Sequence, residues 1–327
     1  MAQTPRTVDV PSLVADAREG RSRAVARLIS LVEDGHPALP EVMAALAPYG
    51  GHAHVIGLTG SPGVGKSTTT AALITAFRDA GRRVAVLAVD PSSPFSGGAL
   101  LGDRIRMEQH ATDPDVFIRS VASRGHLGGL SFATPQALRV LDAAGFDVVL
   151  VETVGVGQSE VEVAARADTT VVILAPGMGD GVQAAKAGIL EIGDVFVVNK
   201  ADRDGADETV RELRHMIQLG NREQSVGWRT PVVRTVASRG DGTPELVQAL
   251  TAHRHWLGES GRLEARRRER ARSEIEAIAL AELRRRIGGA DGLVSDALAS
   301  SVSRGDTDVY AAAREVLGRV TGEGTRQ

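Results

Sequence analysis

The chain has 327 residues, of which 43% are hydrophobic and 24% charged, with a formal net charge of −3. This slightly acidic balance does not favour a nucleic acid as the main partner, and the absence of cysteine excludes disulfides, thiolate metal sites and cysteine nucleophiles. The polar start and the lack of a long uncharged apolar run favour a cytoplasmic protein without a secretion signal or a membrane partner.

Residues 1–50 are predicted to form a helical extension. Leu13, Val25, Leu28 and Val32 recur near helical spacing. Prolines further along divide the segment, so we expect several short helices.

Residues 51–258 are predicted to form an α/β domain with a mostly parallel sheet. From His54 onward, seven short runs rich in valine, isoleucine and leucine alternate with helical segments. Nearly continuous apolar runs are typical of strands that are buried on both faces, as in parallel sheets. The helix stop WLGESG ends the domain near residue 258.

The stretch GSPGVGKST, residues 60–68, lies between a strand ending at Thr59 and a helix starting near Lys66. This is the setting of a phosphate-binding loop, in which backbone N–H groups and a helix N-terminus face phosphate oxygens. Lys66 is predicted to bind the β- and γ-phosphates, and the Ser67 hydroxyl to bind Mg²⁺. The predicted nucleotide-binding residues of the loop are Ser61, Pro62, Gly63, Val64, Gly65, Lys66, Ser67 and Thr68.

Acidic residues that follow two later strands are candidates for the rest of the magnesium site. One apolar run ends at Asp90, which precedes a glycine-rich stretch containing Asp103, and another ends at Glu152. Most GTPases have aspartate at the last of these positions, but the longer glutamate can still hold a magnesium-bound water. Asp103 fits a helix N-cap equally well.

Gly155 follows Glu152 by three residues and is predicted to donate its N–H to the γ-phosphate and to let the loop rearrange after hydrolysis. Gln158 is a candidate for orienting the attacking water. The predicted catalytic residues are Lys66, Glu152 and Gln158.

The sequence NKAD, residues 199–202, follows an apolar strand and favours guanine. The Asp202 carboxylate can accept hydrogen bonds from guanine N1–H and from the 2-amino group, which adenine lacks, while the stem of Lys200 lies along the base. A later strand ends near Ala237, where a backbone N–H can meet guanine O6. The predicted base-binding residues are Asn199, Lys200, Asp202, Ala237, Ser238 and Arg239.

Residues 259–327 are predicted to form a helical arm. One long helix is expected over 262–289, and shorter helices near 293–301 and 306–320. Glutamates alternate with the arginines of the long helix, which favours a solvated, salt-bridged face. A narrow apolar stripe from Ile275 to Ile287 must pack either on the sheet domain or on a second copy of the chain.

Two pairs of histidines are weaker candidates for a function. His52 and His54, like His253 and His255, stand two residues apart, with neither cysteine nor an acidic cluster nearby. Polar turn or helix positions are therefore favoured over metal ligation.

These motifs together resemble one family. GSPGVGKST, AVDPSSPFSGGALLGDRIRM, RGHLGGLS, VETVGVGQSEVEVA, PGMGDGVQAAKAGILEIGDVFVVNKAD and ASRGDG are similar to the MeaB-type GTPases, also called ArgK-like or methylmalonyl-CoA-mutase-associated GTPases. The resemblance spans residues 12–320. It implies a P-loop GTPase related to the signal-recognition-particle and nickel-insertion GTPases, with Asp90 in magnesium binding and with glutamate at position 152 as the usual residue.

The resemblance also implies cofactors, partners and a task. These are GTP or GDP with Mg²⁺, a homodimer made by the C-terminal arm, and a client enzyme, an adenosylcobalamin-dependent acyl-CoA mutase of the methylmalonyl-CoA mutase type. Such proteins act as chaperones that gate cofactor loading and protect the mutase. Residues 176–194 match an additional switch in this family.

Two alternatives stay open. A nucleotide-dependent kinase linked to amino-acid transport would usually prefer ATP, and NKAD favours GTP instead. A metallochaperone GTPase would need cysteine or histidine ligands near the switches, and none is present there.

Overall fold

The structure is a computed structural model. It describes residues 8–91, 110, 112–123, 133–153, 165–177, 190–220, 227–288 and 293–321. The chain divides into two compact units, residues 1–267 and 268–327.

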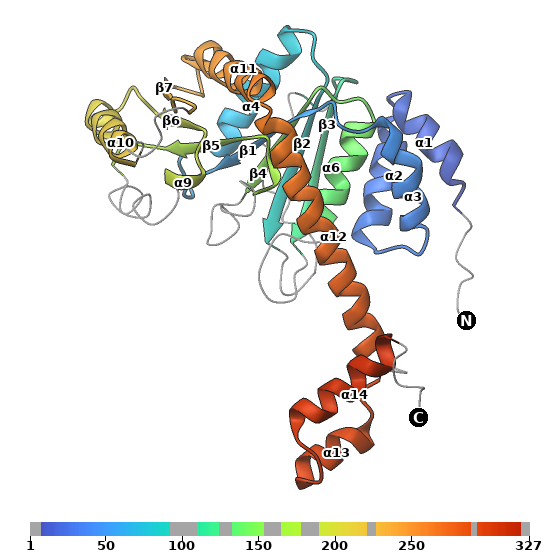
Figure 1. Cartoon of the computed structure of the whole chain (residues 1–327). Coiled ribbons are helices and arrows are strands. Elements are labelled where there is room, and N and C mark those ends of the chain that lie inside the picture. Colours follow the sequence, from blue (N-terminus) through green and yellow to red (C-terminus); the bar gives the residue numbers. More distant parts are fainter. Residues whose placement is uncertain are drawn as a thin grey trace. The chain divides into compact units, whose positions relative to one another are not determined.

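A parallel sheet with the strand order β3-β2-β4-β1-β5-β6-β7 forms the centre of the first unit (Figure 1). All seven apolar runs expected from the sequence form its strands. β5 and β6 are buried along their whole length, as their uninterrupted apolar sequences predict. The strands are β1 (His54–Thr59), β2 (Val84–Pro91), β3 (Val116–Ser123), β4 (Val148–Thr153), β5 (Thr169–Leu174), β6 (Val195–Asn199) and β7 (Val232–Thr235).

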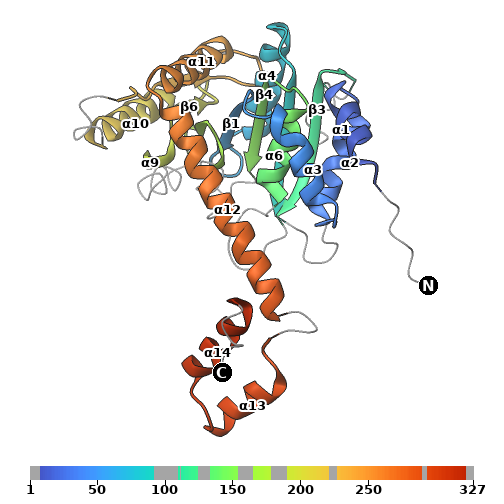
Figure 2. The same ribbon diagram turned by 45° about the vertical axis from the view of Figure 1, so that its right-hand side comes forward.

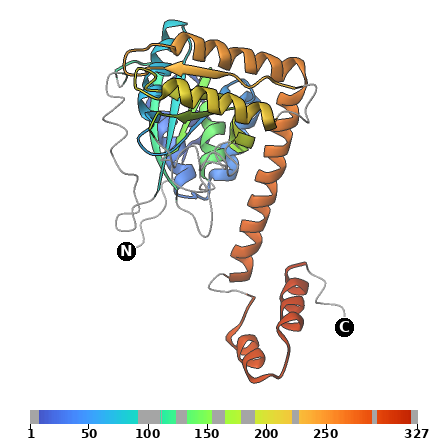
Figure 3. The ribbon, with the colours of Figure 1, turned by 90° about the vertical axis from the view of Figure 1, so that its left-hand side faces the viewer.

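Alternate residues of the strands enter different cores, because successive side chains point to opposite faces of a sheet. On one face, Ile56 and Leu58 of β1 pack with residues of α4 (Lys66–Asp79) and α11 (Thr243–Glu259). On the other face, Val55 packs with α6 (Ala133–Ala143) and the N-terminal helices. The helix α10 (Ala206–Gly220) covers β5 and β6 through a smaller cluster, and with α11 it flanks this edge of the sheet (Figure 3).

The N-terminal segment forms helices, as predicted, and they are part of the sheet domain's core. Their bounds are α1 (Val10–Arg18), α2 (Ser22–Glu33), α3 (Leu39–Leu46) and the 3-10 turn η1 (Ala47–Tyr49). Val25, Leu28, Ile29 and Val32 of α2 are buried in the same core as α6. Figure 2 shows these helices beside α6 and β3.

The C-terminal region is helical as predicted, and among the described residues no helix is both long enough and apolar enough to cross a bilayer. The long helix α12 (Arg262–Gly288) is continuous, and Arg272, Arg285 and Arg286 pair with its own glutamates at 269 and 282. The remaining helices are α9 (Leu190–Ile192), α13 (Asp296–Arg304) and α14 (Val309–Thr321).

The first turns of α12 differ from the expected solvated face. Arg266 and Arg267 bind Asp194 and Asp168 of the sheet domain at 2.8 and 2.9 Å, and Asp168 is fully buried. In the sequence, the two arginines belong to the same charged run as the solvated arginines of the helix. They differ because two buried carboxylates, at the start of β5 and β6, need a cation beside them more than the glutamates of the helix do.

Candidate functional site

The phosphate-binding loop predicted from the sequence joins β1 to α4. Gly60 and Gly65 have φ angles of 140° and 98°, in the region that favours glycine. A Cβ atom would collide with the Ile173 carbonyl at Gly60 and with the Asn199 amide at Gly65. The two glycines therefore allow the loop to lie directly against β5 and the end of β6.

Lys66, at the start of α4, folds its side chain back into the loop. Its ammonium donates to the carbonyls of Gly60 and Ser61 at 2.8 and 3.2 Å. The charge lies beside the N-terminus of α4, where the helix dipole adds positive potential. This is an arrangement that attracts phosphate oxygens.

Glu152 connects the loop to β4. Because β1 and β4 pair in parallel with Leu58 opposite Glu152, the carboxylate reaches the first turn of α4. Ser67 Oγ donates to Glu152 Oε1 at 2.6 Å, and Thr70 Oγ1 donates to Oε2 at 2.8 Å. Sequence reasoning missed Thr70, although its position one helical turn after Ser67 is a signal that places both hydroxyls on one face.

The donor set at Ser67 and Glu152 suits Mg²⁺, which takes hard oxygen ligands and usually shares protein carboxylates with substrate phosphates. Within the described parts of the chain, no group of three or more histidine, cysteine or acidic side chains forms a separate metal cage. Asp90 lies at the end of β2, two residues beyond the partner of Glu152 in the β2–β4 ladder, and its side chain is outside the described part. Asp103, Gly155 and Gln158 also lie outside the described residues.

Asn199 joins three segments. Its Nδ2 donates to the Val64 carbonyl at 2.8 Å, and its Oδ1 accepts from Thr235 Oγ1 and from the Ala237 N–H, both at 3.1 Å. The side chain is 3% exposed. The predicted base motif, the phosphate loop and the segment after β7 are thus brought together, with Thr235 as a partner that the sequence did not indicate.

The next residues of the motif reach toward solvent. Lys200, with a φ of 56°, donates from Nζ to the Gly63 carbonyl at 2.6 Å. Asp202 lies 3.5 Å from Arg239, and both side chains are largely exposed. The carboxylate that is expected to recognise guanine is therefore accessible, next to the predicted segment at 237–239.

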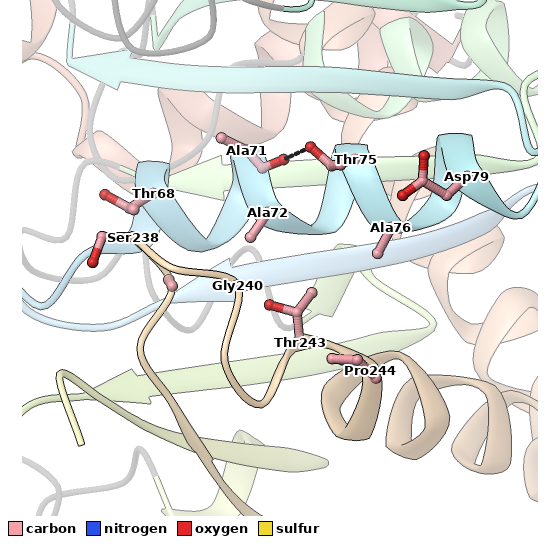
Figure 4. Close-up of a pocket in the computed structure, with 11 residues that line it drawn as sticks. Thr68, Ala71, Ala72, Thr75, Ala76, Asp79, Ser238, Gly240, Thr243 and Pro244 are labelled. Carbon is pink, nitrogen blue, oxygen red and sulfur yellow. Dashed lines mark hydrogen bonds between the residues drawn. The ribbon is translucent and has the colours of Figure 1, made fainter. Parts of the chain in front are cut away.

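A cavity of about 560 Å³ lies between α4 and the segment that leads into α11 (Figure 4). Thr68, Ala71 and Ala72 line it from α4, and Ala237 and Ser238 from the opposite side. The small side chains leave room for a flat group beside the phosphate loop, and the volume is in the range of small-molecule sites.

Comparisons with known proteins agree with this geometry. The family model described as "Methylmalonyl Co-A mutase-associated GTPase MeaB" matches residues 25–291. The chain is 46% identical over 314 residues to a Pyrococcus horikoshii protein whose name assigns it as a GTPase, covering 96% of this chain and 99% of that one. It is 40% identical over 261 residues to GTPase ArgK of Escherichia coli, covering 78% of each.

A solved structure shares the fold over nearly the whole chain. The crystal structure of a LAO/AO transport system kinase superposes with a TM-score of 0.70 at 28% identity, covering 98% of this chain and 100% of that one. The parallel sheet, the glycine loop at the start of α4 and the Asn-Lys-x-Asp turn define a P-loop GTPase. Within that class, the chain belongs to the MeaB family of methylmalonyl-CoA-mutase-associated GTPases, and its activity is the hydrolysis of GTP.

Proposed function

We propose that this GTPase controls an adenosylcobalamin-dependent acyl-CoA mutase of the methylmalonyl-CoA mutase type. GTP binding and hydrolysis gate the loading of adenosylcobalamin and protect the mutase. The observation that carries the proposal is the Asn199 network, which ties the phosphate loop to the base motif in a chain that matches a mutase-associated family over residues 25–291.

In this proposal the residues at the loop hold the triphosphate. Lys66 and the N–H groups of the loop bind the β- and γ-phosphates. Ser67 and Glu152, with Asp90 and Asp103, would hold Mg²⁺, which would supply positive charge against the phosphates. Gly155 contacts the γ-phosphate, and the catalytic set is completed by Gln158, which orients water.

The guanine base occupies the cavity beside α4, between Thr68 and Ala237. Lys200 covers the base, and Asp202 accepts from guanine N1–H and from the 2-amino group. Adenine lacks the 2-amino donor and would leave the carboxylate unpaired, which favours GTP over ATP. This base preference is the reason to prefer a regulatory GTPase over an ATP-dependent kinase linked to amino-acid transport.

The nucleotide state is passed to the mutase through residues 176–194. This segment starts directly after β5, one of the two strands next to the phosphate loop, and it ends at the start of β6. A segment that leaves β5 at the edge of the sheet where β1 leads into the phosphate loop fits a switch that responds to the γ-phosphate.

We also propose that residues 259–327 form an arm that makes a homodimer, beside a GTPase domain at 51–258 and a helical extension at 1–50. Ile275 and Ile278 of α12 are 67% and 45% exposed. Apolar side chains in a row on a helix favour burial against a partner, and a second copy supplies the same row in a two-fold arrangement.

The mutase assignment is tested by GTP turnover with and without purified methylmalonyl-CoA mutase. We expect the mutase to raise turnover of the wild-type protein at least about tenfold, as partners do for GTPases with incomplete sites. Lys66→Ala should lower turnover by about 100-fold or more, since it removes a charge that stabilises the transition state.

The control is Arg27→Ala, which removes an exposed cation of α2 and should leave the stimulation unchanged. Wild-type turnover that no acyl-CoA mutase stimulates would remove the proposed client and leave the GTPase activity. Tight nucleotide-dependent Ni²⁺ binding would favour the metallochaperone instead.

A further inference from the structure

A second hydroxyl group holds the carboxylate of the proposed magnesium site. We propose that Thr70 is a positioning residue that fixes the orientation of Glu152 and thereby raises the affinity of the nucleotide site for Mg²⁺. The inference rests on the proposed function of Ser67 and Glu152 in magnesium binding. It assigns a role to a residue that lies outside the phosphate-loop motif, which ends at Thr68.

The contacts fix both oxygens of the carboxylate separately. Ser67 and Thr70 lie one turn apart on the same face of α4, and Glu152 reaches between them from β4. Ser67 Oγ binds Oε1 at 2.6 Å and Thr70 Oγ1 binds Oε2 at 2.8 Å. Two donors on two different oxygens determine the plane of the carboxylate, which one donor cannot do.

Burial makes the contact from Thr70 strong. Thr70 is 0% exposed and Glu152 is 3% exposed. A buried carboxylate needs donors in place of water, and hydrogen bonds to charged acceptors are stronger than those between neutral groups. The Thr70 hydroxyl also lies 3.0 Å from the Lys66 carbonyl, but its single proton favours the charged and nearer acceptor, Glu152.

The orientation matters for the metal because Oε1 is the oxygen beside Ser67, which the proposal places at Mg²⁺. Thr70 holds the other oxygen toward α4, so that Oε1 stays directed to the Ser67 side. Without the Thr70 hydroxyl, Oε2 loses a donor in a buried place and the carboxylate is free to turn about its last torsion angle. The site then has to order this group each time the metal binds.

The neighbouring residue provides a matched control. Thr69 is also buried, and its hydroxyl donates to the Gly65 carbonyl at 3.0 Å, the same bond within the helix that Thr70 can make to Lys66. Thr69→Val and Thr70→Val therefore remove the same atoms from adjacent positions of one helix. Of the two hydroxyls, it is that of Thr70 that contacts Glu152.

The test compares wild type, Thr70→Val, Thr70→Ser and Thr69→Val by the dissociation rate of a fluorescent GDP analogue. The rate is measured in EDTA and at increasing free Mg²⁺. We expect Thr70→Val to raise the Mg²⁺ concentration that half-maximally slows dissociation by about tenfold or more, the value of one hydrogen bond to a charged group. Thr70→Ser should restore it to within about threefold, and Thr69→Val should match wild type.

Rates in EDTA should be the same for all four proteins, because the role of Thr70 acts through the metal. Equal Mg²⁺ dependence of Thr70→Val and wild type, or an equal change in Thr69→Val, would overturn the inference. If Thr70→Val does not fold, Thr70→Ala takes its place, since alanine favours the helix and also lacks the hydroxyl. A wild-type protein whose GDP release does not respond to Mg²⁺ would instead count against the proposed magnesium site itself.

Discussion

Asn199 shows at the residue scale how one side chain organises the nucleotide site. Its amide is occupied on both ends, by the Val64 carbonyl and by donors from Thr235 and Ala237. Because the side chain is buried and held from two sides, it fixes the distance between the phosphate loop and the segment after β7. In the proposed site, recognition of the base belongs to Asp202, which is exposed nearby.

The role of Asp202 predicts a change of base specificity in Asp202→Asn. An amide donates to the 2-oxo group of xanthine and accepts from N1–H, but it places a donor against the 2-amino group of guanine. We expect GTP affinity to fall by about 100-fold and XTP to become the preferred nucleotide, because a hydrogen-bonded charged group is lost. Competition with a fluorescent nucleotide measures both affinities.

Asp204→Asn is the matched control, since Asp204 is an exposed aspartate of the same turn. It should keep the preference for GTP. A variant Asp202→Asn that still prefers GTP would contradict the assignment of the base site.

What the sequence predicts at this scale depends on how far apart the partners lie. The phosphate loop and NKAD are short motifs whose geometry is local, so the strands and the helix that carry them were predicted correctly, while the roles of their residues stay predictions. Thr70 and Thr235 can be recognised only through their partners on strands, Glu152 and Asn199. The register that aligns β1 with β4 cannot be predicted from the sequence of either strand alone. The roles of Gly155, Gln158 and Asp103 stay predictions.

At the scale of elements, α12 has two different surroundings along its length. As far as Arg267, it is bound to buried carboxylates of the sheet domain, and this is where the first compact unit ends. Beyond that point, its arginines pair with glutamates of the same helix, and Ile275 and Ile278 are exposed. The sequence pattern predicted the helix and its stripe, but it did not separate the bound arginines from the solvated ones, because both belong to one run.

The exposed stripe predicts that Ile275→Glu with Ile278→Glu dissociates the proposed homodimer. Each isoleucine contributes about 1.5–3 kcal/mol when buried, and a glutamate in the same place adds an unpaired charge. We expect the dissociation constant to rise by at least about 100-fold, measured by sedimentation or light scattering over a range of concentrations. Glu276→Gln, an exposed position between the two, should leave the dimer intact. A wild-type protein that is monomeric at high concentration would contradict the proposal.

At the scale of the whole molecule, a polar cluster joins the amino ends of β1, β5 and β6 to α11. The Thr169 hydroxyl lies 2.8 Å from His54 Nε2 and 2.9 Å from His253 Nδ1, so it donates to one ring and accepts from the other. His253 also packs against Trp228 and Trp256, whose rings contact each other as well. The sequence favoured polar turn or helix positions for these histidines. His253 does lie on a helix, where it is fully buried, whereas His54 is the first residue of strand β1.

Burial of the two rings gives the protein a predicted sensitivity to acid. Desolvation lowers the pKa of His54 to about 3, against the attraction of Asp168 and with the help of Arg254, His253 and Arg267. Desolvation likewise lowers the pKa of His253 to about 4, with Asp194 and Asp168 opposing and Arg266 assisting. Both rings are therefore neutral in the folded protein at pH values where the unfolded chain already binds protons, below its ordinary pKa of 6.5.

The free energy of unfolding should thus have its full value with respect to the two histidines above pH 6.5. It should fall as the pH drops toward the folded pKa values, by up to about 1.4 kcal/mol per pH unit for each histidine. Urea unfolding at several pH values between 7 and 4.5 measures this slope. His253→Gln keeps a hydrogen-bonding side chain but does not titrate, so it should be less stable at pH 7 and show a shallower slope. His255→Gln, on the exposed side of the same helix, should keep the wild-type slope, because this ring is 78% exposed and lies outside the buried cluster. An unchanged slope in His253→Gln would mean that other groups carry the acid sensitivity.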